Sequence, residues 1–171
     1  MAWKIQVTQA KPNPAGKDTN RHAPIAQQLL AEWVDLKNIG DASVTLSTLH
    51  LTNVEFGPGC QLKKQAVVYW NGPSSITLRP GEVVRVHTGR EYESWQMRQE
   101  DRNGVDHHAY ANRGGFVLNN DCGDVIGVYW QSNGQWHCED AASYDANPPE
   151  GQILVRSGSK LLPVPIGARY W

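Results

Sequence analysis

The sequence lacks any long hydrophobic run. No apolar segment approaches the roughly 18 residues that a membrane-spanning helix needs, so we expect no membrane partner. The first residues, MAWKIQVTQAKPNP, also lack the continuous apolar stretch that follows the positive charge of a secretory signal peptide. These absences predict a protein that is either cytoplasmic or exported by a non-classical route.

Cysteine is scarce as well. The three cysteines, Cys60, Cys122 and Cys138, are odd in number and widely spaced, which argues against a disulfide framework and is compatible with a reducing compartment. A bridge between Cys122 and Cys138 would form only if their strands are neighbours. The chain has no Cys-x-x-Cys, His-Glu-x-x-His or Gly-x-Ser-x-Gly pattern and no glycine-rich phosphate loop, so we expect no cofactor and no metal centre.

Neither sign of charge is in excess. The formal net charge is -1 and the isoelectric point is about 6.6, so no global basic field attracts nucleic acid. With 40% hydrophobic and 19% charged residues, the 171-residue chain has the composition of one folded domain with additions rather than of a disordered protein.

What the sequence does contain is the pattern of an all-β protein. Its 16 glycines and 10 prolines separate short runs in which apolar and polar residues alternate, which is typical of a β-sandwich or barrel. Strands are predicted at residues 4–9, 32–38, 44–51, 81–89, 115–119, 124–130 and 135–140, with a bend inside 44–51 where the apolar phase slips. Alternation predicts a core that includes Val34, Leu36, Leu46, Val84, Val86, Phe116 and Leu118.

Three segments do not fit this pattern. Residues 24–33 contain good helix formers after Pro24, but we expect extended structure from about Leu30 onward. Residues 90–113 have no clean period and are predicted to form a long loop, either functional or mobile. Residues 147–171 predict a C-terminal extension, either a hairpin that docks on its own domain or a partner-binding tail.

Six motifs occur in an order that resembles the lamin tail domain in its bacterial form. They are NPAGKD (13–18), EWVDLKNIGD (32–41), LSTLHL (46–51), LRPGEVVRVHTG (78–89), LNNDCGDVIGV (118–128) and DAASY (140–144). The resemblance implies an immunoglobulin-like β-sandwich over residues 1–146. It also implies a non-catalytic interaction module that binds a macromolecule, and the absence of a global basic charge favours a protein partner or self-association over nucleic acid. The 90–113 loop and the 147–171 extension are additions to the family's pattern.

The sequence NNDCGD at 119–124 allows two interpretations. Asn119, Asp121 and Asp124 offer hard oxygen ligands for Ca²⁺. The same residue types also favour a tight turn, because Asn and Asp bond their own backbone and Gly123 tolerates a positive φ. Since the EF-hand spacing and its distal glutamate are absent, we favour the turn.

Catalysis is the main rival interpretation. His87, Asp106, His107 and His108 could form the centre of a metal-dependent hydrolase. However, adjacent histidines on an extended chain point to opposite sides, so one ion cannot easily bind both. Glu32 shares the parity of the predicted core residues, and we expect it to be buried and held by hydrogen-bond donors rather than to act as a base.

The aromatic residues suggest two kinds of binding surface. Seven tryptophans fit core packing, but exposed ones would also suit a carbohydrate-binding sandwich, which is a second alternative function. For the favoured protein partner, we predict binding through the aromatic and apolar residues of the two additions, namely Trp95, Met97, Tyr110, Tyr170 and Trp171.

Overall fold

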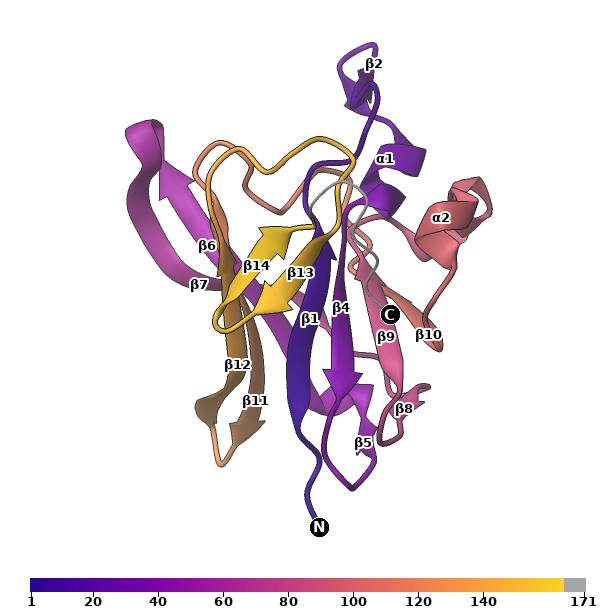
Figure 1. The fold of residues 1–171 in the computed structure, drawn as a ribbon, viewed down its shortest axis with the longest axis vertical. Coiled ribbons are helices and arrows are strands. Elements are labelled where there is room, and N and C mark those ends of the chain that lie inside the picture. The colour runs from indigo at the N-terminus through magenta and orange to yellow at the C-terminus, as the bar shows by residue number, and fades with distance from the viewer. Residues whose placement is uncertain (165–171) are drawn as a thin grey trace.

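The chain folds mainly into strands, as the computed structural model of residues 1–164 shows (Figure 1). All-β is therefore confirmed as the fold class. Ten strands form the main sheet, in the spatial order β10 (His107–Tyr110), β9 (Val83–His87), β4 (Trp33–Asn38), β1 (Ile5–Lys11), β13 (Leu154–Ser157), β14 (Lys160–Pro163), β12 (Gln135–Tyr144), β11 (Asp124–Ser132), β6 (His50–Gly57) and β7 (Gln61–Asn71). Two small pairs accompany it, β2 (Thr19–Asn20) with β3 (Ala23–Pro24) and β5 (Val44–Thr45) with β8 (Thr77–Leu78).

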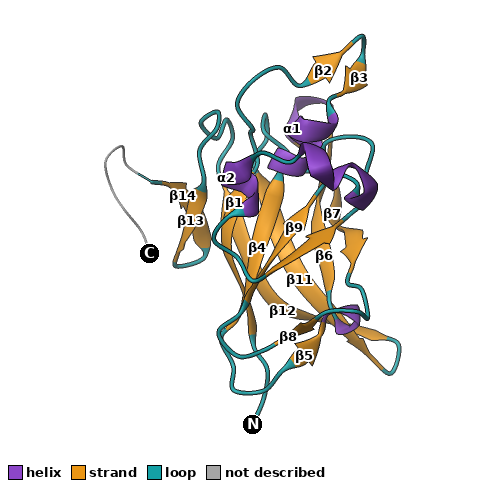
Figure 2. Ribbon diagram, turned by 90° about the vertical axis from the view of Figure 1, so that its right-hand side faces the viewer, coloured by secondary structure: helices purple, strands orange, loops and turns teal. Residues whose placement is uncertain are grey.

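The main sheet curls so that its two ends enclose the core. One run is β10-β9-β4-β1, the other is β12-β11-β6-β7, and the hairpin β13–β14 joins them (Figure 2). Side chains from both runs form one apolar cluster, which includes Val7, Leu36 and Val84 from the first run and Leu51 and Ile126 from the second. Two facing runs are also what a sandwich requires, but the immunoglobulin-like arrangement itself stays a prediction.

Helical segments gather at one end of the molecule, opposite the turn between β11 and β12 (Figure 1). They are α1 (Ala26–Ala31), α2 (Gln99–Arg102) and the 3₁₀ turn η3 (Glu91–Gln96); two further 3₁₀ turns are η1 (Leu46–Thr48) and η2 (Pro58–Cys60). Leu30 and Ala31 are helical, so extended structure begins later than the sequence predicted. Turn η1 is the bend expected within residues 44–51.

The predicted core is confirmed with one exception. Val34, Leu36, Leu46, Val84, Val86 and Leu118 are all buried, but Phe116 is 37% exposed. Residues 115–119 form no strand, so alternation along them does not decide which side chains face inward. The prediction for Phe116 was wrong for that reason.

Residues 154–163 contribute two strands to the main sheet rather than lying outside it. Strand β13 pairs with β1, and β14 pairs with β12. Arg156 of β13 reinforces this position, because its Nη1 donates to Asp140 Oδ2 and to the Val7 carbonyl, each at 2.8 Å. Val7 N in turn donates to Asp140 Oδ2 at 2.8 Å. One carboxylate therefore links β1, β12 and the C-terminal hairpin.

Candidate binding surfaces

Residues 90–113 do not form a loose loop, because helix α2 and its neighbours cover the outer face of β4 and β9 and residues 107–110 form the edge strand β10. The guanidinium of Arg85 donates to both carboxylate oxygens of Asp35, at 2.8 and 2.9 Å, and lies 3.6 Å from the ring centre of Trp33. Its third nitrogen donates to the carbonyl oxygens of Asp101 and Asn103, both at 3.1 Å. The ion pair thus joins β4 to β9, and Arg85 also binds the covering segment through two of its backbone carbonyl groups.

A second buried ion pair holds helix α2 to the same face. Lys11 Nζ lies 2.8 Å from Asp101 Oδ1, and the indole Nε1 of Trp33 donates to that oxygen at 2.9 Å. Lys11 is 4% and Asp101 1% exposed. A buried charge without a partner is strongly destabilising, so each of these groups fixes the position of the other.

His87 and His108 form a pair whose three polar contacts could all be hydrogen bonds only if the two rings shared an additional proton. His87 Nδ1 faces the Leu30 carbonyl at 2.6 Å, His87 Nε2 faces His108 Nδ1 at 2.8 Å, and His108 Nε2 faces the Arg102 carbonyl at 3.0 Å. Two neutral rings carry only two N–H groups, so three hydrogen bonds require one added proton. Burial opposes it, lowering the pKa of His87 to about 3 and lowering the pKa of His108 below its usual value.

Of the four residues of the alternative hydrolase centre, only His87 and His108 are in contact. Asp106 Oδ2 accepts a hydrogen bond from Val83 N at 2.9 Å, and His107 Nε2 lies 3.0 Å from Glu82 Oε2, away from the His87–His108 pair. Within residues 1–164, no group of three or more His, Cys, Asp and Glu side chains is arranged to hold a metal ion. No helix in this range is long and apolar enough to cross a bilayer.

Two large aromatic side chains stand out from the covering segment. Tyr92 is 74% and Trp95 78% exposed, and both belong to η3. Side chains three residues apart eclipse each other in a 3₁₀ turn, so the two rings lie on the same side of it. We call this pair the η3 aromatic patch.

The backbone beneath the η3 aromatic patch is held at several points. Gln27 of α1 donates to the Gln96 carbonyl at 3.2 Å, and Arg102 donates to the Ser94 carbonyl at 3.1 Å. Met97 follows the turn and is only 7% exposed, so it anchors the segment by burial. The patch is therefore presented by an ordered backbone.

The residues predicted to bind a partner are thus divided by the structure. Trp95 is exposed and Met97 is buried, whereas Tyr110 is half-buried and stacks on His87 with ring centres 5.3 Å apart. Tyr170 and Trp171 lie outside the described residues. Sequence reasoning missed Tyr92. If a 3₁₀ turn had been expected here, the spacing of three residues between Tyr92 and Trp95 would have placed the two rings on the same side of it.

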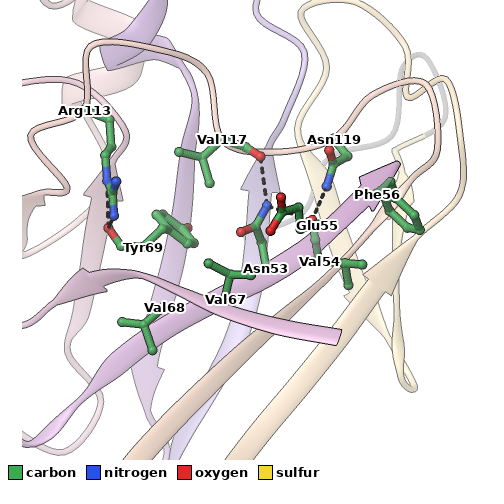
Figure 3. Close-up of a pocket in the computed structure, with 10 residues that line it drawn as sticks. All are labelled: Asn53, Val54, Glu55, Phe56, Val67, Val68, Tyr69, Arg113, Val117 and Asn119. Carbon is green, nitrogen blue, oxygen red and sulfur yellow. Dashed lines mark hydrogen bonds between the residues drawn. The ribbon is translucent and has the colours of Figure 1, made fainter. Parts of the chain in front are cut away.

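A cleft of about 300 Å³ lies between the β6–β7 hairpin and residues 113–119 (Figure 3). Three of its polar side chains are bonded to nearby backbone, and Glu55 pairs with Lys63 and Lys64. Asn53 donates to the Val117 carbonyl at 2.9 Å, Asn119 to the Val54 carbonyl at 2.7 Å, and Arg113 to the carbonyl of Tyr69 at 3.1 Å. We therefore interpret the cleft as a structural seam.

Glu32 lies under this seam and is completely buried, as the sequence predicted. Its Oε1 accepts hydrogen bonds from Thr88 Oγ1 at 2.6 Å, Val117 N at 2.9 Å and Leu118 N at 3.1 Å. Among the described atoms, its Oε2 has no partner. Burial, aided by the charge of Asp124 and opposed by these hydrogen bonds, raises the pKa of Glu32 to about 7.

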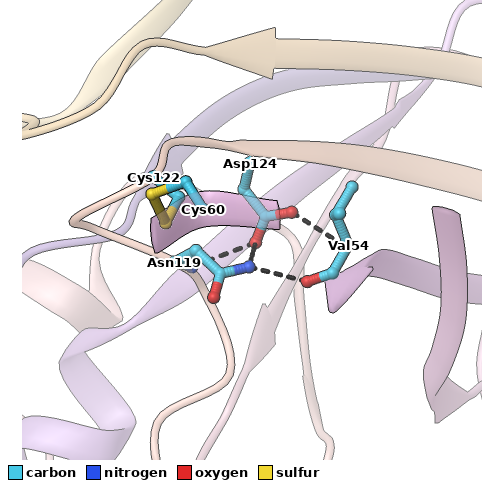
Figure 4. Close-up of a disulfide and its surroundings, with 5 residues drawn as sticks. All are labelled: Val54, Cys60, Asn119, Cys122 and Asp124. Atoms are coloured by element: carbon cyan, nitrogen blue, oxygen red, sulfur yellow. Dashed lines mark hydrogen bonds between the residues drawn. A yellow bond between two sulfur atoms is a disulfide. The ribbon is translucent and has the colours of Figure 1, made fainter. Parts of the chain in front are cut away.

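The NNDCGD sequence forms a turn organised by a buried carboxylate (Figure 4). Asp124 Oδ1 accepts from Val54 N at 2.9 Å and Val125 N at 2.8 Å, while its Oδ2 accepts from the backbone and side-chain nitrogens of Asn119 at 3.0 and 2.9 Å. Asn53 Nδ2 also donates to Oδ2 at 3.1 Å. Gly123 has a φ of +71°, as the turn interpretation requires. With its oxygens engaged in this way, Asp124 acts as a structural acceptor.

The same turn carries a disulfide between Cys122 and Cys60 (Figure 4). The suggested pairing of Cys122 with Cys138 was wrong, and so was the argument against disulfides. Cys138 is free and exposed, and faces Tyr129 on the neighbouring strand. Hairpin β6–β7 brings Cys60, at its tip, back to the turn across 62 residues of sequence, a long-range contact that cysteine spacing alone does not reveal.

Comparison with known proteins adds no family assignment. The chain matches no protein-family model and no curated protein. The function proposed below therefore rests on this chain's own residues and on the resemblance given above.

Proposed function

We propose that this protein is a non-catalytic interaction module that binds a protein partner through the η3 aromatic patch. The observation that carries the proposal is the exposure of Tyr92 and Trp95, at 74% and 78%, on a backbone fixed by hydrogen bonds and buried ion pairs. Large aromatic residues held rigidly in solvent lose little entropy on binding and dominate the energy of many protein interfaces.

The surroundings of the patch favour a protein over nucleic acid. Glu91 and Glu93 flank Tyr92, and their carboxylates would repel a phosphate backbone. Arg90 lies 3.7 Å from Glu93 at a partly exposed ion pair, so charges of both signs border the rings. An aromatic centre with a mixed polar rim is the usual composition of a protein interface.

The resemblance to lamin tail domains supports the same function, because domains of that family act as interaction modules. The two facing runs of strands are compatible with the immunoglobulin-like sandwich that the resemblance implies. The Cys60–Cys122 disulfide favours an oxidising compartment for this module.

Site-specific photocrosslinking in the cells that make the protein tests this proposal. A photoreactive phenylalanine analogue replaces Tyr92 or Trp95, and Leu62, 61% exposed on the distant β7, serves as the control position. We expect one protein, or a second copy of this chain, to crosslink at 92 and 95 and not at 62. The crosslinked partner, once purified, should bind the wild-type protein and should bind the Trp95→Ala variant with at least tenfold lower affinity. Equal crosslinking at all three positions, or none at 92 and 95, would contradict the proposal.

A further inference from the structure

A second group of rings lies far from the η3 aromatic patch, on the outer face of β6, β11 and β12. Tyr129 of β11 pairs with His50 of β6 on one side and with Cys138 of β12 on the other. Trp136 stands nearly perpendicular to both rings, with ring centres 4.9 Å from His50 and 6.4 Å from Tyr129 at interplanar angles of 76° and 78°. We call His50, Tyr129 and Trp136 the outer ring cluster.

A glycine makes room for this cluster. A Cβ atom on Gly127 would lie 2.6 Å from a ring carbon of Tyr129 and 2.6 Å from Thr52 Oγ1, which is too close for any side chain. The Tyr129 ring therefore lies directly over bare backbone on the sheet surface.

The outer ring cluster differs from the tryptophan on the opposite face of the same hairpin. Trp130 is covered on two sides, because it stacks on His137 at 4.3 Å and meets the edge of Trp3 at 6.0 Å. Trp136 is instead 47% exposed. Cross-strand packing accounts for its contacts with His50 and Tyr129, but not for leaving half of an indole in solvent.

The polar atoms beside the rings belong to an imidazole, an amide and a phenol. His50 Nδ1 lies 2.6 Å from Asn71 Oδ1. Since an amide oxygen only accepts, Nδ1 carries a proton there and donates. The Asn71 amide nitrogen and the Tyr129 hydroxyl complete the set. Neither the outer ring cluster nor Asn71 contains a carboxylate, ammonium or guanidinium group.

These features select one class of ligand. Sugar rings present weakly polar C–H faces that stack on aromatic rings, together with hydroxyl groups that both donate and accept hydrogen bonds. A charged ligand would find no counter-charge in the cluster. We propose that the outer ring cluster, with Asn71, binds a neutral carbohydrate.

Native affinity electrophoresis tests this site with defined probes. Hydroxyethyl cellulose, xyloglucan, glucomannan, laminarin and soluble xylan are cast separately into gels, with a plain gel as the reference. We expect at least one of them to retard the wild-type protein. Trp136→Ala should abolish that retardation, whereas Trp95→Ala, which removes the exposed tryptophan at the other end of the molecule, should leave it unchanged.

A spectroscopic measurement on the wild-type protein shows whether the ligand acts at Trp136, independently of any misfolding of the Trp136→Ala variant. In ¹H–¹⁵N spectra the Trp136 indole signal is assigned by its loss in Trp136→Phe. It should shift with increasing tetrasaccharide of the retarding polysaccharide, while the Trp95 signal, assigned in the same way, should not. The proposal is wrong if no polysaccharide retards the protein, if Trp136→Ala is retarded like the wild type, or if the Trp136 signal does not respond.

Discussion

The two faces of strands β4 and β9 are both buried, but by opposite chemistry. The inner face places Val34 and Leu36 against Val86 and Val84 in an apolar core. The outer face, in the same strands, is an ion pair between Asp35 and Arg85 under a layer of residues 90–113. Apolar packing tolerates substitutions of similar volume, whereas a buried ion pair fails when one partner is removed. We therefore expect both faces to contribute to stability, with the loss of one ionic partner on the outer face costing the most, and we expect the outer face also to position the segment that carries the η3 aromatic patch.

The largest effect should come from breaking the ion pair on one side only. Asp35→Ala leaves Arg85 buried without a carboxylate, and we expect a loss of about 3–5 kcal/mol in the free energy of unfolding. The matched control is the double variant Asp35→Leu, Arg85→Met, which removes both charges and should lose much less. Urea unfolding followed by circular dichroism measures both. If the single variant were as stable as the double, the outer face would not be held by this pair.

A cavity on the inner face should have a slightly smaller effect. Leu36 is completely buried, and Leu36→Ala should cost about 3–4 kcal/mol through lost burial and the cavity left behind. Phe116→Ala is the comparison, because this ring is 37% exposed and should cost no more than about 1.5 kcal/mol. If Phe116→Ala lost more free energy of unfolding than Leu36→Ala in the same experiment, the burial of these two side chains would be wrongly assigned.

Glu32 is a buried carboxylic acid among the inward-facing residues and should make stability depend on pH. Its folded pKa of about 7 lies above the ordinary value of 4.5, so the folded state binds more protons between these two values. The free energy of unfolding should therefore fall as pH rises from about 4.5 to 7, by about 3 kcal/mol in total.

Because burial also raises the pKa values of Asp35 and Asp124, the contribution of Glu32 has to be isolated by difference. Glu32→Gln should be nearly free of this part of the pH dependence, whereas Glu91→Gln, an exposed carboxylate, should retain it. Thermal melts at half-unit pH steps give the comparison. Parallel profiles for wild type and Glu32→Gln would show that Glu32 does not titrate in this range.

The difference between the two faces also shows which features could be predicted from the sequence and which could not. Alternation correctly predicted that Val34 and Val84 face inward, since a period of two follows from strand geometry. By the same alternation, Arg85 and His87 lie on the outer face. What it could not reveal was that α2 folds back over Arg85 and that β10 places the rings of His108 and Tyr110 against His87, so that both outer side chains are buried.

The candidate sites show the same limit. The turn at 119–124 could be predicted because Asn, Asp and Gly have local conformational preferences. The Cys60–Cys122 bridge and the burial of Met97 depend on contacts between distant segments, which no local pattern encodes. Trp95 was found from its residue type alone, but its pairing with Tyr92 needed the 3₁₀ geometry of η3.

The smallest effect on stability should come from the η3 aromatic patch itself. Trp95 is 78% exposed, so Trp95→Ala should change the free energy of unfolding by no more than about 0.5 kcal/mol. Met97, two residues further on, is 7% exposed, and Met97→Ala should cost about 2 kcal/mol because it leaves a cavity under the segment. The two substitutions thus distinguish a residue that contacts the partner from a residue that stabilises the segment beneath it. Trp95→Ala should weaken partner binding at unchanged stability, whereas Met97→Ala should lower both the stability and the melting temperature of the domain. A loss above about 1 kcal/mol for Trp95→Ala would mean that the ring packs against the protein, and the patch would then be part of the covering layer rather than a surface kept free for a partner.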